Sequence, residues 1–385
     1  MGPTSMGILF WLRSIAAATV LIVRIAPCAD AKQAEWTIGS NPVSRLGAVD
    51  QTDVTFAEVV GATRLANGNV IVGDHGDFAL REFSPTGVVV KSFGRKGGGP
   101  GEIRTLRSMH RCGDSLFTVD LDGRKVSTFS LEGRFVRQFR FAAPHSNSSY
   151  RTACNGAQRF VHYGWEAESD MRGGTYRPLV PFWTTGADGS VEAVLGRFPG
   201  SERFGLVIEN QLRGSRPLPL GRETQIAIGS KRVYLGIAEA FEVQVFSETG
   251  ANLGTLKSAR PAARARVADV ERARSAEILS KGKQWEASVA RDYSMMQLRS
   301  TLPAYDRILV DSQDWVWVRV FPRAGESSHR WIVFDTSNAE RASVVVPAQF
   351  EVLEIGSDYV LGRYVDDADQ VPEVRLYELM RASQR

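Results

Sequence analysis

Short apolar runs alternate with turn residues along most of this chain. Asn69–Val72 and Ser115–Val119 are two such runs, and Gly, Asn or Asp residues bound each of them. Runs of this length between turn residues predict β-strands rather than helices. The Asp that follows the first run, Asp74, recurs as Asp120, which indicates a repeated unit of about 46 residues.

A second pattern marks the turns of the repeat. A Phe is followed four residues later by Gly or Asn in five places: Phe83–Gly87, Phe129–Gly133, Phe182–Gly186, Phe246–Gly250 and Phe334–Asn338. Gly and Asn accept the positive φ that a tight hairpin turn requires. A hairpin repeated with a period of 40–50 residues is typical of a β-propeller.

The end of the chain predicts a sixth, incomplete unit. Tyr377 stands where the repeated Phe belongs, but the sequence stops before an outermost strand can follow it. Near the other end, Glu35–Gly39 is expected to form a strand with no partner of its own, and Ser44–Val49 is a second candidate. Pairing this N-terminal segment with the sixth unit would close the ring and remove an exposed edge. We therefore expect an all-β fold, a six-bladed β-propeller of four-stranded antiparallel blades, as a single domain over residues 32–385.

One stretch departs from the β pattern. Residues 257–300, between the fourth and fifth blades, are expected to form a helical insertion. Trp285, Val289, Tyr293 and Met296 fall on one face of a helix. We expect this stripe to pack onto the propeller, and the alternative is a helix that docks a partner.

A glycine-rich segment carries a family resemblance. Phe93–Ile103 (FGRKGGGPGEI) resembles the FGxxGxGPGEF motif of NHL-like six-bladed β-propellers, a family of secreted bacterial proteins. The segments Trp315–Val318, Trp331–Asp335 and Ile355–Gly362 strengthen the resemblance, which departs from the family at Ile103 and in the third unit. It implies the propeller fold and export, but members of the family have few assigned activities.

The N-terminus reads as a targeting segment. Ser14–Val23 is a ten-residue apolar run, and Ala29-Asp30-Ala31 offers a cleavage site of the A-x-A type. We expect a signal peptide over residues 1–31, a periplasmic or secreted mature protein, and no transmembrane domain after its removal. An uncleaved N-terminal anchor and lipid attachment at Cys28 are the alternatives.

Two cysteines remain after such cleavage. Cys112 and Cys154 each precede the first hairpin of their unit, in adjacent blades, so they are expected to be neighbours in space. Export favours oxidation, which predicts a Cys112–Cys154 disulfide. The alternative is a pair of buried free thiols.

Charge excludes one class of partner. The net charge is +4, and the helical insertion concentrates the positive charge, with ten Lys or Arg against five Asp or Glu between Lys257 and Arg299. A nucleic-acid-binding surface would be a broad basic face with stacking aromatic residues, which this pattern is not. We expect no nucleic acid among the partners.

Hairpin connectivity divides the loops between two faces. In a blade of strands a, b, c and d, the a–b and c–d turns lie at one end, which we call the turn face. The b–c loops and the connections to the next blade lie at the other, the loop-rich face. Because longer and variable loops usually carry binding, we expect a site on the loop-rich face, over the central channel. The candidates are Asp74, His75, Asp77, Arg95, Lys96, Asp120, Arg124, His162 and Arg319.

Two of these groups suggest specific chemistry. Asp74, Asp120 and His162 are interpreted as ending strand b in successive blades, where they would form a weak candidate metal site. The alternative is a structural role in which Asp bonds turn amides. Arg95 and Lys96 begin a glycine-rich loop suited to an anion, although the P-loop spacing is absent and a blade connection is the preferred interpretation.

Catalytic motifs are sparse. The chain has only five His and neither an H-E-x-x-H nor a G-x-S-x-G motif. We expect an exported, non-enzymatic propeller that binds an unidentified ligand or protein. No cofactor is predicted, although a divalent metal stays open. The alternative functions are a metal-dependent lyase or hydrolase with a site on the propeller axis, and an assembly component that docks through the helical insertion.

Overall fold

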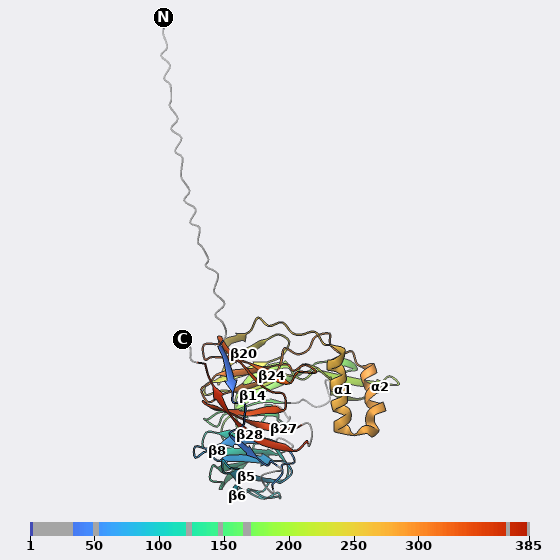
Figure 1. Ribbon diagram of the computed structural model, residues 1–385. Helices are drawn as coiled ribbons and strands as arrows, with labels where there is room; N and C mark the ends of the chain where they lie inside the picture. Colours follow the sequence, from blue (N-terminus) through green and yellow to red (C-terminus); the bar gives the residue numbers. More distant parts are fainter. Residues whose placement is uncertain are drawn as a thin grey trace. The chain divides into compact units, whose positions relative to one another are not determined.

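A computed structural model describes residues 1–2, 34–48, 54–120, 125–144, 149–164, 171–366 and 370–382. The expected signal peptide, with Cys28, and the candidate Arg124 lie outside these ranges. The chain divides into two units, of which Gln33–Arg385 contains every helix and strand that the structure describes (Figure 1). No helix within the described ranges is long and apolar enough to cross a membrane.

Four four-stranded antiparallel sheets form blades one to four, and four antiparallel strands of a nine-stranded sheet form blade five. Blade one is β3 (Val59–Arg64), β4 (Val70–Asp74), β5 (Ala79–Phe83) and β6 (Val89–Phe93); blade two is β7 (Leu106–Cys112), β8 (Ser115–Asp120), β9 (Lys125–Ser130) and β10 (Phe135–Arg140). Blade three is β11 (Ser149–Cys154), β12 (Phe160–Gly164), β14 (Leu179–Thr185) and β15 (Val191–Pro199); blade four is β18 (Gln225–Ile228), β19 (Arg232–Gly236), β20 (Glu242–Ser247) and β21 (Asn252–Lys257). Blade five is β22 (Tyr305–Val310), β23 (Val316–Val320), β24 (Ser328–Phe334) and β25 (Glu340–Pro347).

The sixth blade combines both ends of the propeller. Its inner strands are β26 (Phe350–Ile355), β27 (Tyr359–Val365) and β28 (Pro372–Met380), and β2 (Ser44–Leu46) pairs with β28 as the outermost strand. The preceding strand β1 (Ala34–Ile38) lies parallel to β25 of blade five and touches the end of β28. The predicted ring closure is confirmed, with Ser44–Leu46 as the main closing strand. The six-bladed β-propeller is the fold of this unit.

Apolar side chains hold adjacent blades together. Phe83 of blade one packs in one buried cluster with Leu361 of blade six, and Trp331 of blade five packs in another with Phe350 of blade six. All four side chains are fully buried. Because each blade buries its faces against its neighbours, closing the ring also completes the core.

The repeated turn is confirmed in four of its five predicted copies. Gly87, Gly133, Gly250 and Asn338 all have positive φ. The third copy is wrong: Gly189, rather than Gly186, takes the positive φ, and its amide donates to the Gly186 carbonyl. Pairing explains the shift, since Thr185 lies opposite Phe160, as Phe83 lies opposite Val70 in blade one.

The predicted disulfide is confirmed. Cys112 at the end of β7 and Cys154 at the end of β11 are bonded, and their Cα atoms lie 5.8 Å apart. Both strands are the innermost of their blades and end at the turn face. The bond therefore links blades two and three at that face.

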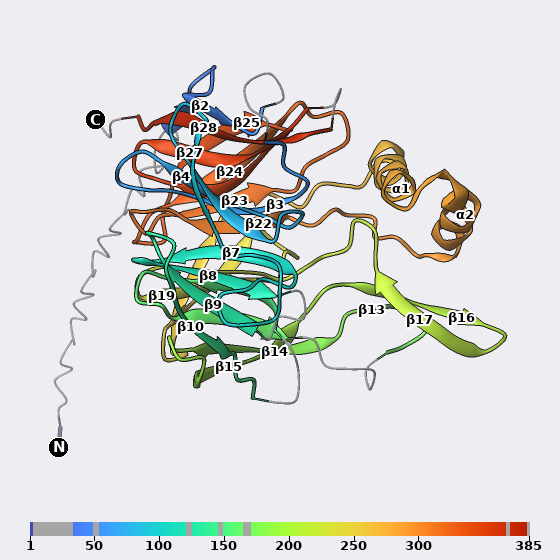
Figure 2. The same cartoon turned by 90° about the horizontal axis from the view of Figure 1, so that it is seen from below.

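All of the large insertions leave from the loop-rich face. A three-stranded sheet of β13 (Gly174–Tyr176), β16 (Arg203–Ile208) and β17 (Gln211–Pro217) arises from two connections of blades three and four. The helices α1 (Val267–Lys281) and α2 (Glu286–Met295), with a 3₁₀ turn at Lys283–Trp285, connect β21 to β22. We call these elements the side lobe, and Figure 2 shows them together beside the blades.

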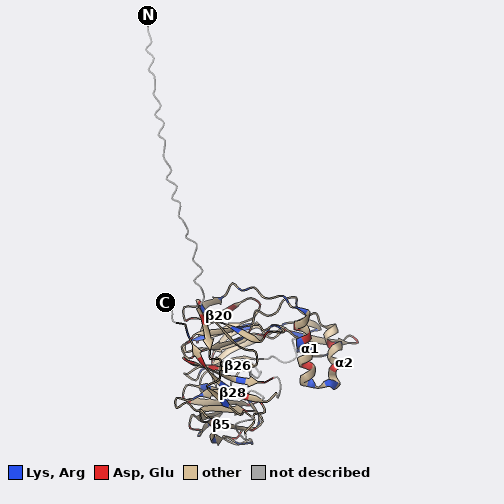
Figure 3. Ribbon diagram, viewed as in Figure 1, with Lys and Arg blue, Asp and Glu red and all other residues tan. Residues whose placement is uncertain are grey.

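The side lobe has a small core of its own. Phe204, Leu218 and Met296 are buried together, and Arg216 of β17 forms ion pairs with Asp292 and Glu277 of the helices. The predicted apolar stripe is divided, because Val289 is buried whereas Trp285 is 52% exposed. Figure 3 shows Lys and Arg near the connected ends of α1 and α2.

Polar contacts anchor the lobe to the ring. Glu202, in the connection from blade three, accepts hydrogen bonds from the Arg222 amide at 2.8 Å and from Arg299 Nε at 3.1 Å. Asp269 of α1 accepts one from the Ala324 amide of blade five at 2.8 Å. Both carboxylates are almost fully buried. Burial opposes ionisation of Asp269, but hydrogen bonds from the Arg266 side chain and from the Ala324 and Arg266 amides outweigh it and lower its pKa.

Candidate ligand site in the central channel

A cavity of about 1310 Å³ runs between the innermost strands of the blades. Residues of β3, β7, β11, β18, β22 and β26, one strand from each blade, line it. Successive side chains of a strand point to opposite sides, so each of these strands turns some side chains toward the cavity. The residues that line this channel decide what it can hold.

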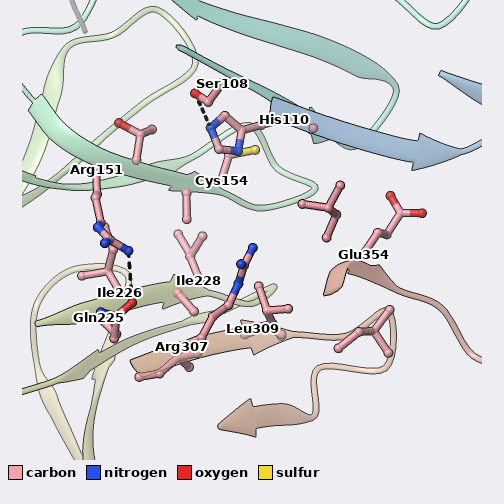
Figure 4. Close-up of a pocket in the computed structure, with 18 of the residues that line it drawn as sticks. Ser108, His110, Arg151, Cys154, Gln225, Ile226, Ile228, Arg307, Leu309 and Glu354 are labelled. Carbon is pink, nitrogen blue, oxygen red and sulfur yellow. Dashed lines mark hydrogen bonds between the residues drawn. The ribbon is translucent and has the colours of Figure 1, made fainter. Parts of the chain in front are cut away.

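The middle of the channel wall is apolar. Ile226 and Ile228 of β18, Leu309 of β22 and Leu353 of β26 contribute to it. Figure 4 shows Ile226, Ile228 and Leu309 beside the Arg307 side chain, which projects from β22 into the cavity. The channel thus combines an apolar surface with charged groups.

Arginines and carboxylates cluster at the loop-rich end of the channel. Arg319 of β23 forms two 2.8 Å hydrogen bonds with Asp306 of β22. Glu351 of β26 pairs with both Arg307 and Arg363. Burial opposes ionisation of Glu351, but the two guanidinium groups outweigh it and lower its pKa. Burial also lowers the pKa of Arg307.

A second ion pair lies in the wall between blades three and four. Arg151 of β11 forms a 2.6 Å ion pair with Glu223 and donates to Gln225 Oε1 at 3.1 Å (Figure 4). Glu223 also accepts a 3.0 Å hydrogen bond from the Tyr163 hydroxyl. This carboxylate and guanidinium balance each other in charge.

At the turn-face end of the channel the polar groups are bonded to one another. Glu354 of β26 accepts hydrogen bonds from the Tyr359 hydroxyl at 2.6 Å and from the Arg64 amide at 3.0 Å. His110 Nε2 lies 2.9 Å from Ser108 Oγ on β7. Burial lowers the pKa of His110 to about 4, so this imidazole is neutral near pH 7 and is a weak base. The Ser–His contact therefore lacks an effective general base.

Two predicted residues support the framework of blade one. The Asp74 carboxylate accepts hydrogen bonds from the amides of Ala57, Glu58 and Gly76, at 2.8 to 3.1 Å. This is the structural role considered as the alternative to metal binding. His75 Nδ1 lies 2.8 Å from the Leu106 carbonyl of blade two, so the ring bridges the two blades.

The glycine-rich loop binds a carboxylate of its own. Glu102 accepts a 2.8 Å hydrogen bond from the Gly99 amide and pairs with Arg95. These two contacts lower the pKa of Glu102. Lys96 lies over the Phe78 ring, 4.6 Å from its centroid. Because Glu102 occupies the amide cradle, the loop is a blade connection, the interpretation preferred from the sequence.

His162 occupies a different position from that assigned to it. Strand pairing shows that Gly164, not His162, is the counterpart of Asp74 and Asp120, since Phe160 corresponds to Val70 and Leu116. His162 is fully buried inside blade three, with its ring nitrogens 3.0 Å from Thr152 Oγ1 and 2.9 Å from Thr185 Oγ1. Burial, with a smaller contribution from His110, lowers its pKa to about 3. The alignment of His162 with the two Asp residues was wrong.

This arrangement does not support the hypothesis of a metal site. Within the ranges that the structure describes, no group of three or more His, Cys, Asp or Glu side chains is placed to hold a metal ion. Asp120 ends β8, and Asp77 pairs with Arg81 on its own blade. Asp74, Asp120 and His162 therefore do not come together.

Arg319 is the predicted residue that lines the channel. Its pairing with Trp331 places it one residue before the strand position that corresponds to Asp74 in blade one. The remaining channel residues, above all Arg151, Arg307 and Glu351, were missed. The available signal was the presence of charged residues within the innermost strands, SYRTAC, YDRILV and FEVLEI. In a propeller these strands surround the axis, so their charges identify the channel.

Comparison with known proteins supplies no family. No protein-family profile and no curated protein matches the sequence. An exported protein of Bacteroides fragilis NCTC 9343 has a similar structure, with 14% identity, coverage of 91% of this chain and 95% of that chain, and a TM-score of 0.48. A DUF4221-family protein of Bacteroides vulgatus ATCC 8482 is 8% identical, with 91% and 100% coverage and a TM-score of 0.49.

A third similar structure is the calcium-binding protein regucalcin of Agrobacterium tumefaciens C58. It is 10% identical, with coverage of 91% of this chain and 98% of that chain and a TM-score of 0.43. Likeness at this level carries no argument about function, and the fold rests on the strand pairing itself. Membership of the NHL-like family stays a prediction.

Proposed function

We propose that this chain is an exported, non-enzymatic propeller that binds a ligand through its loop-rich face, over the central channel. The observation that carries the proposal is the channel itself. Its cavity of about 1310 Å³ is larger than the 300–1,000 Å³ of ordinary small-molecule sites. It combines apolar walls with charged groups at the loop-rich end.

The placement of the insertions supports the same face. β13, the β16–β17 hairpin and the α1–α2 pair all arise from connections at the loop-rich end. Loops held by a rigid scaffold are where binding residues concentrate. The turn face, by contrast, carries short hairpins and the Cys112–Cys154 bond. That bond also supports export, because disulfides persist in oxidising compartments.

The metal-dependent lyase or hydrolase alternative has less support. Asp74 is bonded to three amides and His162 is enclosed within blade three, so neither side chain faces the channel. We therefore propose ligand binding without a catalytic step.

A blocked channel tests the proposal. A panel of small molecules is screened by thermal shift against the native chain and against Leu309→Trp, which places a large ring in the channel wall. The matched control is Val194→Trp, at a position that is 57% exposed on the outer strand β15. Compounds that bind in the channel should stabilise the native chain and the control but lose their effect on Leu309→Trp.

The contradicting result is equally specific. Compounds that stabilise Leu309→Trp as strongly as the native chain would place binding elsewhere. A panel without any channel-dependent compound would remove the support for small ligands. Export is tested separately, by N-terminal sequencing of the protein recovered from the periplasm, with Lys32 as the expected first residue.

A further inference from the structure

The charged cluster at the loop-rich end of the channel is unbalanced. Three guanidinium groups, of Arg307, Arg319 and Arg363, meet two carboxylates, of Asp306 and Glu351, among the residues that the structure describes there. Each oxygen of Asp306 accepts a hydrogen bond from Arg319. Glu351 is shared, with one oxygen toward Arg307 and the other toward Arg363. Within this group of five described side chains, one positive charge is left over.

The surplus positive charge faces the cavity through the Arg307 side chain. Its side chain is 24% exposed, and Figure 4 shows it projecting into the channel. Neighbouring Arg319 adds positive charge, and burial lowers the Arg307 pKa. His329 interacts electrostatically with Arg319, and burial lowers the His329 pKa too. A partly buried cation without a full counter-charge is costly, and a bound anion would offset that cost.

The described residues of the adjacent wall, between blades three and four, do not supply the missing charge. Arg151 and Glu223 balance each other, and Gln225 beside them is neutral. Next to Arg307, the surface is formed by Ile226, Ile228 and Leu309 (Figure 4). A ligand that contacts Arg307 would therefore place the rest of its body against aliphatic side chains.

We infer that the loop-rich end of the channel binds an amphiphilic monocarboxylate, with the carboxylate on Arg307 and the apolar body along Ile226, Ile228 and Leu309. This inference rests on the proposed function and names its ligand class. The planar guanidinium fits a carboxylate through two parallel hydrogen bonds. A single surplus charge matches a monoanion better than a phosphate dianion.

Isothermal titration with octanoate tests the inference. Octanamide has the same tail without the charge, acetate has the charge without the tail, and inorganic phosphate tests the dianion. We expect octanoate to bind with one-to-one stoichiometry and about tenfold or more tighter than any of the three, since a hydrogen bond to a charged group contributes about 1.5–3 kcal/mol.

Two substitutions change the charge balance in opposite directions. Arg307→Leu removes the surplus and leaves Glu351 paired with Arg363, so octanoate affinity should fall about tenfold or more. Glu351→Gln raises the surplus from one charge to two, so octanoate should bind several-fold tighter. Opposite effects distinguish recognition of the anion from general disruption, which would weaken binding in both variants. Thermal melting of both variants checks that the propeller is folded, and Arg307→Lys, which keeps the charge, should retain part of the affinity.

The outcomes separate this inference from the proposed function. If octanamide binds as tightly as octanoate, and Leu309→Trp abolishes both, the channel binds ligands but the carboxylate inference is overturned. If octanoate binding survives Leu309→Trp, both fail. If octanoate does not bind, or binds Arg307→Leu as well as the native chain, the inference alone is overturned.

Discussion

The ring and the side lobe are built on different physical principles. In the ring, apolar clusters run between neighbouring blades, and large side chains such as Trp317 and Trp331 are almost fully buried. Among the described residues of the lobe, one small cluster contains three buried residues, each 5% to 8% exposed, while Leu279 is 79% exposed. Polar contacts of Glu202 and Asp269 tie the lobe down.

This difference assigns the stability of the protein to the ring and places the side lobe where ligands would reach the channel. Burial of apolar surface supplies most of the folding free energy, so the ring should set the melting temperature of the protein. The lobe stands on the loop-rich face, where Arg307 and Glu351 line the channel, and its attachment depends on ionised carboxylates. Changes in the ring should therefore unfold the protein, whereas changes in the lobe should alter only the lobe.

The largest effect is expected from the disulfide. Replacing both Cys112 and Cys154 by Ala opens a loop of 42 residues between the two strands, which should lower the free energy of unfolding by about 4 kcal/mol. Denaturant unfolding measures this, and reduction of the native chain should give a similar loss. A loss below about 1 kcal/mol would show that blades two and three are held by packing alone.

The second-largest effect on stability is expected from replacing Asp74. Asp74→Ala leaves three backbone amides without their acceptor and should cost about 2–3 kcal/mol of unfolding free energy. The matched control is Asp77→Ala, since Asp77 is a partly exposed carboxylate paired with Arg81, and such pairs contribute about 0–1 kcal/mol. Equal losses in chemical denaturation of the two variants would contradict the structural role of Asp74.

A smaller effect is expected from pH. The pKa values of His110 and His162 are lowered to about 4 and about 3, whereas in the unfolded chain an imidazole titrates near 6.5. The unfolded state therefore binds more protons below about pH 6.5, and stability should fall as the pH is lowered from there toward 4. His162→Gln should flatten the dependence of the melting temperature on pH in this window. An unchanged slope would show that His162 is not held neutral.

The smallest effect on the ring is expected from the lobe anchor. Asp269→Ala removes the acceptor for the Ala324 amide and for Arg266. The ring should keep its melting temperature to within about 2 °C, while limited proteolysis between Lys257 and Arg299 should become faster. If the melting temperature falls as far as in Asp74→Ala, the lobe belongs to the cooperative core of the ring and the comparison fails.

The fold was largely predictable because its repeat is local. The repeated turns depend on one backbone conformation at one residue, and such positions can be recognised in a sequence. These residues are Gly87, Gly133, Gly250 and Asn338. The turn of the third blade was predicted at the wrong place. Phe182 happens to lie four residues before Gly186, whereas the residue with positive φ is Gly189. The β16–β17 hairpin was missed because its strands pack on an insertion rather than on the repeat.

The candidate site was less predictable. Loop residues such as Asp74, His75 and Arg95 looked available, but their partners come from other segments: the Ala57 amide, the Leu106 carbonyl and the Glu102 carboxylate. The channel residues look ordinary in sequence, since Arg307 and Glu351 become neighbours only when blades five and six pair side by side. The charge imbalance between them is a property of the assembled ring.

The closing strand β2 also constrains the order of assembly. Arg45 in β2 pairs with Glu373 in β28, across 328 residues of sequence. During synthesis, β2 therefore waits for nearly the whole chain before it finds its partner. Long-range pairing of this kind is slow to form, so we expect the sixth blade to close late in folding. The strand β2, which completes the sixth blade, thus delays closure of the ring as well as securing it.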